Sequence, residues 1–369
     1  MKKFIYNIIL FFFLLFPFAE FTARYFMDYN APFSERIVYN LQYEDGKLKP
    51  NQILYHTKKG RILKDSIKYK INNHGHRGDN YKLDKDENET RILFLGSSSL
   101  YDEHFYYSNG GDFTRQISKG LDANIRIINA SRPGFTIDNI NYIIQNDIIS
   151  YNPDIVLISS IWNDIKNITS DRDALIQFER TDNNKLPKNP LMYPTNRFDK
   201  LLSVSAIYRK LRDYYWTKIL KIHRGNKYIE NFIIKDKNII RNFNAELKHY
   251  EEQWIEAIDY LKYNNIIPII IIEERLINKN NSINEKRKIK YFLVKVQSHV
   301  ELVDIFNKCD SILYNISELK DIQLIDINAQ IPNNSTFFVD HIHTTEIGSR
   351  YRAEQYVKYI SKYLKKINK

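Results

Sequence analysis

Four residues have the types and the order along the chain that serine hydrolysis requires. Ser98 lies in the stretch LGSSSL, Asn163 lies in IWND, and Asp340 and His343 lie three residues apart in DHIH. Such hydrolysis needs a nucleophilic hydroxyl, an imidazole that takes its proton, a carboxylate that orients the imidazole, and donors for the oxyanion. We therefore predict that Ser98 is the nucleophile, His343 the base and Asp340 the group that orients it.

The oxyanion of such a reaction needs hydrogen-bond donors that point at one place. We predict that the backbone amides of Ser98 and Gly134 and the side-chain amide of Asn163 supply them. A glycine leaves room for its amide to approach the substrate. An asparagine donates without carrying charge, and one such donor lowers the barrier by about 3 kcal/mol.

Three nearby residues allow alternative readings of the site. His341 is the rival of His343, but an adjacent Asp340–His341 pair cannot readily form the triad hydrogen bond. His341 is therefore expected to be a loop residue or a substrate contact. His104 and Trp162 are further candidates for substrate contacts, and packing is the equal alternative for Trp162.

Alternating strands and helices are predicted after residue 89, and they would bring these residues together. The expected strands cover residues 91–96, 125–131, 153–164, 266–274 and 322–327. The expected helices cover residues 112–121, 136–149, 242–263, 284–309 and 344–367. This alternation predicts an α/β fold with a parallel sheet and helical crossovers. In such a sheet, ligands bind beyond the carboxyl ends of the strands, where the predicted site residues would gather.

Residues 91–360 resemble the SGNH (GDSL-like) hydrolase family. The motifs that carry the resemblance are Ser98 in LGSSSL, Gly134 in SRPGFT, Asn163 in IWND, and Asp340 with His343 in DHIH. The stretch INNHGHRG, followed by a charged linker and RILFLG, is similar to the lead-in of membrane-anchored bacterial members. The resemblance implies a flavodoxin-like three-layer α/β/α sandwich with a five-stranded parallel sheet, ester or acyl-transfer chemistry, and no metal or cofactor.

The sequence departs from the family pattern at two positions. Ser97 stands where the family has an aspartate before the nucleophile, and Ile161 stands where it has a glycine two residues before the asparagine. Three consecutive serines also leave the nucleophile open to a shift of one position. Ser98 is chosen because it is the second residue after Gly96, as in the family.

An apolar segment opens the chain. Lys2 and Lys3 precede a run from residue 4 to 18. The run is short for a span of about 20 residues, and extending it would place Glu20 or Arg24 near the membrane interface. No spacing of small residues marks a cleavage site, so we favour an uncleaved signal anchor over a cleaved signal peptide. The two lysines predict that the chain beyond residue 30 lies outside the cytoplasm, in the periplasm or at the cell surface.

The remaining divisions follow from changes in pattern along the chain. We predict an anchor at residues 1–29, an irregular polar lead-in at 30–88, and a hydrolase domain at 89–369. Within the domain, residues 166–235 lose the regular alternation and are expected to be an insertion with some helix. This insertion is predicted to cover the site and to set its specificity.

Charge and cysteine content exclude several classes of function. The 369 residues carry a formal net charge of +11, but the lysines are spread along the chain and mixed with acids. A protein that binds nucleic acid gathers its positive charge in a patch or stripe, so no nucleic-acid partner is expected. Cys309 is the single cysteine, which excludes an intrachain disulfide and a cysteine-based metal site.

The sequence thus predicts a membrane-anchored serine esterase. Its expected substrate is a small O-acyl group, such as acetyl, on a surface glycan or a lipid-linked sugar. An O-acyltransferase that uses the same Ser98, His343 and Asp340 site is the first alternative. The second is a non-catalytic binding module on the same fold, which the intact set of site residues disfavours.

Overall fold

The computed structural model describes most of the sandwich and parts of the flanking segments. It covers residues 15–26, 43–44, 47–58, 61–102, 112–169, 197–202, 205–215, 242–291 and 298–367, with residues 6, 10, 13, 294 and 296. His104 and most of the predicted insertion lie outside these residues, so the predictions made for them stay predictions.

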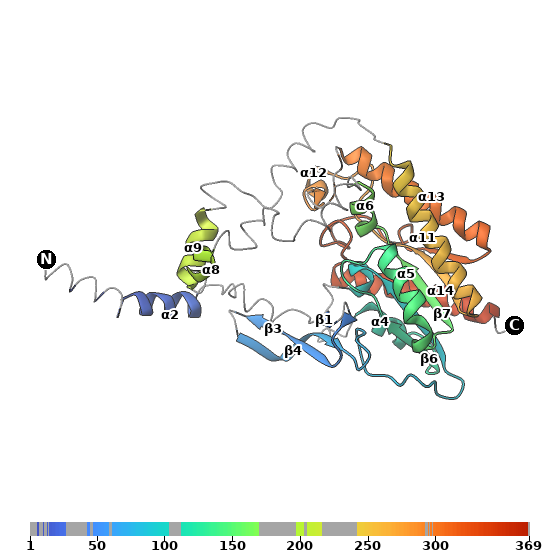
Figure 1. Ribbon diagram of the computed structural model, residues 1–369, viewed down its shortest axis with the longest axis horizontal. Coiled ribbons are helices and arrows are strands. Elements are labelled where there is room, and N and C mark those ends of the chain that lie inside the picture. The colour runs from blue at the N-terminus through green and yellow to red at the C-terminus, as the bar shows by residue number, and fades with distance from the viewer. Residues whose placement is uncertain are drawn as a thin grey trace.

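Five parallel strands form the central sheet (Figure 1). They are β5 (Thr90–Gly96), β6 (Ile125–Asn129), β7 (Ile155–Ser159), β8 (Ile267–Ile272) and β9 (Gln323–Asp326). Their order in the sheet is β6-β5-β7-β8-β9, and every neighbouring pair is parallel. This is the flavodoxin-like order 2-1-3-4-5, in which the crossovers place helices on both faces. The predicted α/β fold with a five-stranded parallel sheet is confirmed.

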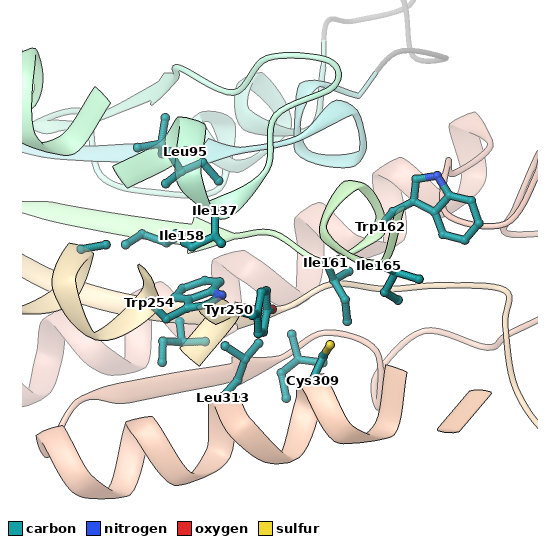
Figure 2. Close-up of a cluster of buried hydrophobic side chains, with 14 of the residues drawn as sticks. Leu95, Ile137, Ile158, Ile161, Trp162, Ile165, Tyr250, Trp254, Cys309 and Leu313 are labelled. Carbon is teal, nitrogen blue, oxygen red and sulfur yellow. The ribbon is translucent and has the colours of Figure 1, made fainter. Parts of the chain in front are cut away.

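Two helical layers cover the sheet because the side chains of each strand alternate between its faces. One layer is α4 (Phe113–Lys119) and α14 (Glu346–Ile367), and the other is α5 (Ile137–Asn146), α11 (Asn244–Tyr263) and α13 (His299–Lys320). On β5, Ile92 and Phe94 pack in the core beneath α4 and α14. Leu93 and Leu95 pack in the other core, part of which Figure 2 shows. Cys309 is buried there.

The structure also describes elements outside the sheet and its two helical layers. They are α2 (Phe16–Phe26), β1 (Tyr43–Glu44), β2 (Lys47–Leu48), β3 (Gln52–Lys58), β4 (Arg61–Ile71), α3 (Ser98–Tyr101), η3 (Ile148–Tyr151), α6 (Trp162–Ile168), α8 (Arg197–Leu202), α9 (Ala206–Tyr214) and α12 (Ile283–Lys286). In the part of the chain that the structure describes, no helix combines the length and the apolar character needed to cross a bilayer.

Three predicted elements were wrong in extent or type. The third strand ends at Ser159, and Trp162 begins helix α6 instead of continuing the strand. The helix predicted to end at residue 309 begins at His299 and continues to Lys320. The lead-in is not wholly irregular, because β3 and β4 form an antiparallel hairpin within it. In β4, Ile67, Tyr69 and Ile71 alternate with lysines, a period of two that indicates a strand and that the prediction overlooked.

Candidate active site

A sharp turn at the end of β5 presents Ser98. At Gly96, a Cβ would lie 2.7 Å from both the Leu100 Cδ1 and the Ser159 carbonyl oxygen, so only glycine fits without a shift. Ser97 is extended, and helix α3 begins at Ser98. Strand β5 therefore ends at the carboxyl edge of the sheet, and the Ser98 hydroxyl lies in the first turn of the buried helix α3.

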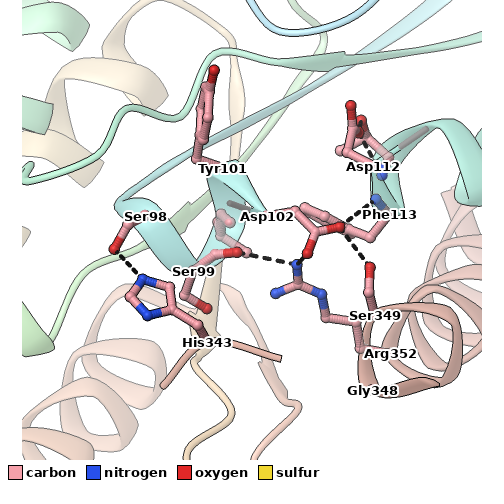
Figure 3. A network of polar contacts seen from close by, with 12 residues as sticks. Ser98, Ser99, Tyr101, Asp102, Asp112, Phe113, His343, Gly348, Ser349 and Arg352 are labelled. Carbon is pink, nitrogen blue, oxygen red and sulfur yellow. Dashed lines mark hydrogen bonds and ion pairs between the residues drawn. The ribbon is translucent and has the colours of Figure 1, made fainter. Parts of the chain in front are cut away.

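Ser98, His343 and Asp340 form a hydrogen-bonded chain, and Figure 3 shows its first link. His343 Nε2 lies 2.9 Å from Ser98 Oγ, and His343 Nδ1 lies 2.9 Å from each oxygen of Asp340. An ionised carboxylate can only accept, so Nδ1 must donate to Asp340 and Nε2 is left to accept from the serine. This tautomer is the one that a general base for Ser98 requires. The geometry that the sequence predicted is present, whereas the catalytic roles stay predictions.

Asp340 is held in its ionised form by the donors around it. Its Oδ1 accepts from the backbone amides of Ile342 at 3.2 Å and His343 at 3.0 Å, and Lys290 Nζ lies 2.6 Å from Oδ2. Burial acts to raise the pKa of Asp340. The hydrogen bond from His343 and the contact with Lys290 outweigh burial, so this pKa lies well below its ordinary value. The carboxylate stays charged at any pH at which a histidine base would work.

Lys290 is a partner of the site that the sequence did not indicate. It lies 50 positions before Asp340 in a lysine-rich chain, and no motif marks it. Its side chain is about 40% exposed, and its ammonium contacts the oxygen of Asp340 that also faces His343 Nδ1. A cation here favours the ionised form of Asp340, which is the form that orients the imidazole.

The three predicted oxyanion donors come from the ends of three adjacent strands. The loop after β6 is tied to β5 by the Arg132 amide, which donates to the Gly96 carbonyl at 2.9 Å. Gly134 in this loop has φ +87°, and the position of its missing Cβ faces open space. Asn163 follows β7, and its Nδ2 donates to the Phe135 carbonyl at 3.0 Å. This contact uses one of the two amide protons, which leaves the other for a substrate oxygen.

We expect Asn163→Ala to lower kcat by about 100- to 1000-fold, the usual effect of removing one side-chain donor from an oxyanion hole. The assay is steady-state hydrolysis of p-nitrophenyl acetate by the folded variant. Asn146→Ala is the control, because Asn146 donates to the Tyr142 carbonyl on the exposed surface of α5. A wild-type kcat in Asn163→Ala would remove this residue from the proposed oxyanion hole.

The rings of Trp162 and His341 pack against each other next to His343. Their ring centroids are 3.8 Å apart, and Trp162 also stacks on Phe306 at 6.3 Å. Both side chains are buried. Burial lowers the pKa of His341 well below 6.5, the nearby Asp340 opposing this only in part, so the ring is neutral. These contacts favour the packing role for Trp162, and a substrate contact by either residue stays a prediction.

Asp164 anchors the start of helix α6, which carries Asn163. Its carboxylate accepts from the Ile137 amide at 2.8 Å and from the Ser160 hydroxyl. Burial raises the pKa of Asp164 to about 7, although these hydrogen bonds oppose the shift. The residue thus links α6 to the first turn of α5, on the side of the sheet where Gly134 and Asn163 lie.

A buried network supports the helix that carries Ser98 (Figure 3). Arg352 of α14 donates to the Ser99 carbonyl at 3.0 Å, pairs with Asp102 at 2.8 Å and also pairs with Glu274. From the lead-in, Arg77 donates to the Asp102 carbonyl at 2.7 Å. Two buried guanidinium groups therefore bind carbonyl groups of α3 and of the residue that ends it. Neither could be predicted from the sequence, because arginines are usually exposed.

Comparisons with known proteins find similarity in structure only. No protein-family profile matches the chain, and no curated protein matches it significantly in sequence. A catalytic mutant of an acetylxylan esterase from Geobacillus stearothermophilus is 12% identical, with a TM-score of 0.41 over 74% of this chain and 95% of the other. A GDSL-like lipase from Bacteroides thetaiotaomicron is 11% identical, with a TM-score of 0.37 over 73% and 89%. Such distant similarity does not identify an activity, which has to be inferred from the chain's own residues.

Proposed function

We propose that the chain is a serine esterase of the SGNH type. The observation that carries the proposal is the contact of 2.9 Å between Ser98 Oγ and His343 Nε2, with Asp340 on the other ring nitrogen. The surrounding groups fit the same chemistry. Asp340 is ionised, and Gly134 and Asn163 follow the two strands that flank the nucleophile's strand.

The proposed reaction has two stages. Ser98 Oγ attacks the acyl carbon while its proton passes to His343 Nε2, and the amides of Ser98, Gly134 and Asn163 stabilise the oxyanion. The imidazolium then protonates the departing alkoxide, which leaves an acyl-serine. Water attacks this ester with His343 as the base, and the acid is released with the free serine. Asp340 orients the imidazole and stabilises its cation throughout.

We propose a small O-acyl group on a glycan or a lipid-linked sugar as the substrate, hydrolysed outside the cytoplasm. The support for this location is the sequence of the first residues, in which Lys2 and Lys3 precede the apolar run 4–18. Such a segment tethers a chain to the membrane with the following residues on the far side. Lipid-linked and surface glycans are the acyl carriers within reach of an enzyme held there.

Labelling with a fluorophosphonate tests the proposed chemistry. The phosphonate should become covalently attached to Ser98, and mass spectrometry of the digested protein locates it among the three consecutive serines. Turnover of p-nitrophenyl acetate should be lost in proportion to labelling. Absence of both labelling and turnover would favour a non-catalytic binding module. Acyl transfer to an added oligosaccharide in preference to water would identify a transferase.

A further inference from the structure

Helix α2 is joined to helix α9 of the insertion by a carboxylate cap. Glu20 accepts from the Ser205 hydroxyl at 2.8 Å, the Ala206 amide at 2.6 Å and the Ile207 amide at 3.2 Å. The first amides of a helix have no partner within the helix, and a negative charge at this end is favourable. Glu20 therefore satisfies α9 from a segment about 185 residues away in sequence.

A second buried contact joins α9 to α8. Arg212 Nε and Nη2 lie 2.6 and 2.8 Å from the two oxygens of Asp199, and the Tyr208 hydroxyl donates to the same carboxylate at 3.0 Å. Asp199 is only 5% exposed and Arg212 only 6%. Together α2, α8 and α9 form what we call the three-helix cluster, which lies apart from the α/β sandwich (Figure 1).

Large apolar side chains cover the outside of the three-helix cluster. Phe18 is 70% exposed, Phe198 69% and Leu211 63%. The other exposed apolar side chains described on it, or in the residues that precede it, are Tyr6, Leu10, Phe13, Leu15, Phe21, Leu201, Leu202, Tyr214 and Tyr215. In water, apolar patches of this extent are uncommon on a protein surface.

The cluster buries an ion pair and exposes large apolar side chains. The Arg212–Asp199 pair and the Glu20 carboxylate are satisfied within the cluster, whereas Phe18, Phe198 and Leu211 face outward. Proteins in lipid show this arrangement, because ionisable groups there must be paired in the interior. Tyrosines at the end of α9 also suit the border between lipid and water. The surface is therefore better matched to a bilayer than to an aqueous protein partner.

We propose that α8 and α9 lie in the membrane surface beside α2, with their exposed apolar side chains among the lipids. Helix α9 has nine residues, about 14 Å in length, which is too short to cross a hydrocarbon core of about 30 Å. An interfacial position fits this length. Because Glu20 caps α9, the arrangement also accounts for an acidic residue that follows an apolar run. The inference rests on the proposed membrane location and not on the proposed catalysis.

Depth-dependent quenching of a fluorophore tests the inference. The full chain, with Cys309→Ser, would carry Leu201→Cys or Leu211→Cys labelled with NBD and be reconstituted into phosphatidylcholine/phosphatidylglycerol vesicles. Leu319→Cys is the matched control, since Leu319 is an equally exposed leucine on α13 of the sandwich. We expect blue-shifted emission and about two-fold or stronger quenching by doxyl-labelled lipid at positions 201 and 211, and neither at 319.

The possible outcomes test the interfacial position of α8 and α9, the membrane location and the catalysis separately. If the chain floats with the vesicles but the probes at 201 and 211 are not quenched, the inference is wrong and the anchor stands. If the chain does not float, the membrane location fails with it. Emission that shifts without vesicles and rises with protein concentration would mean that a second copy covers the surface, which also overturns the inference. Turnover of p-nitrophenyl acetate in the same samples reports on catalysis separately.

Discussion

Ser98→Ala should lower kcat for p-nitrophenyl acetate by about 10⁴- to 10⁶-fold, the range found when the nucleophile of a serine hydrolase is removed. The reason is that the hydroxyl of Ser98 lies 2.9 Å from His343 Nε2, the nitrogen placed to take its proton. Without the serine, the imidazole can at most activate water. Residual turnover then comes only from the oxyanion donors and substrate binding.

The neighbouring serine provides the control for this prediction. Ser97 Oγ lies 3.5 Å from Glu273 Oε1, whereas Ser98 Oγ contacts His343, so Ser97→Ala should keep most of the activity and the fluorophosphonate label. The two variants remove the same atom one residue apart, which cancels any general effect on folding. If Ser97→Ala loses activity and Ser98→Ala keeps it, the register of the nucleophile is wrong. If both keep it, the proposed mechanism fails.

The sequence predicted the sheet well because buried parallel strands leave a strong local signal. In β5 and β7, runs of apolar residues end at Gly96 and Ser159, where the strands also end. The third strand was extended too far because Ile161 and Trp162 are apolar and buried, although they lie in the turn and helix that follow. Hydrophobic residues are expected to be buried, but burial alone does not distinguish a strand from the short helix α6 that follows it.

The triad could be predicted because its members are of unusual type for their positions. A serine after a buried strand and a carboxylate three residues before a histidine are both visible in sequence, and the structure joins them across 245 positions. Lys290 and Arg352 left no such mark. Each is one of many basic residues, and only the folded chain shows that Lys290 meets Asp340 and that Arg352 is buried.

Arg352→Met should lower the free energy of unfolding by about 3–5 kcal/mol, as expected when one partner of a buried ion pair is removed. This is the largest effect on stability that we predict. Its guanidinium, fully buried, neutralises two buried carboxylates, those of Asp102 and Glu274. Burial, and next the charge of Glu274, raise the pKa of Glu273 to about 8, so this third carboxyl is neutral at pH 7 and adds no charge. Removing the cation leaves two anions in the core. Thermal and urea unfolding measure the loss.

Arg350→Met is the matched control for this prediction. It lies on the same helix and breaks only an exposed pair with Glu346 at 2.9 Å, so it should lower the free energy of unfolding by about 0.5 kcal/mol or less. An equal loss in the two variants would show that the buried charge of Arg352 does not matter. Since Arg352 also donates to the Ser99 carbonyl, the electrostatic explanation further requires that fluorophosphonate labelling of Ser98 slows in Arg352→Met and not in Arg350→Met.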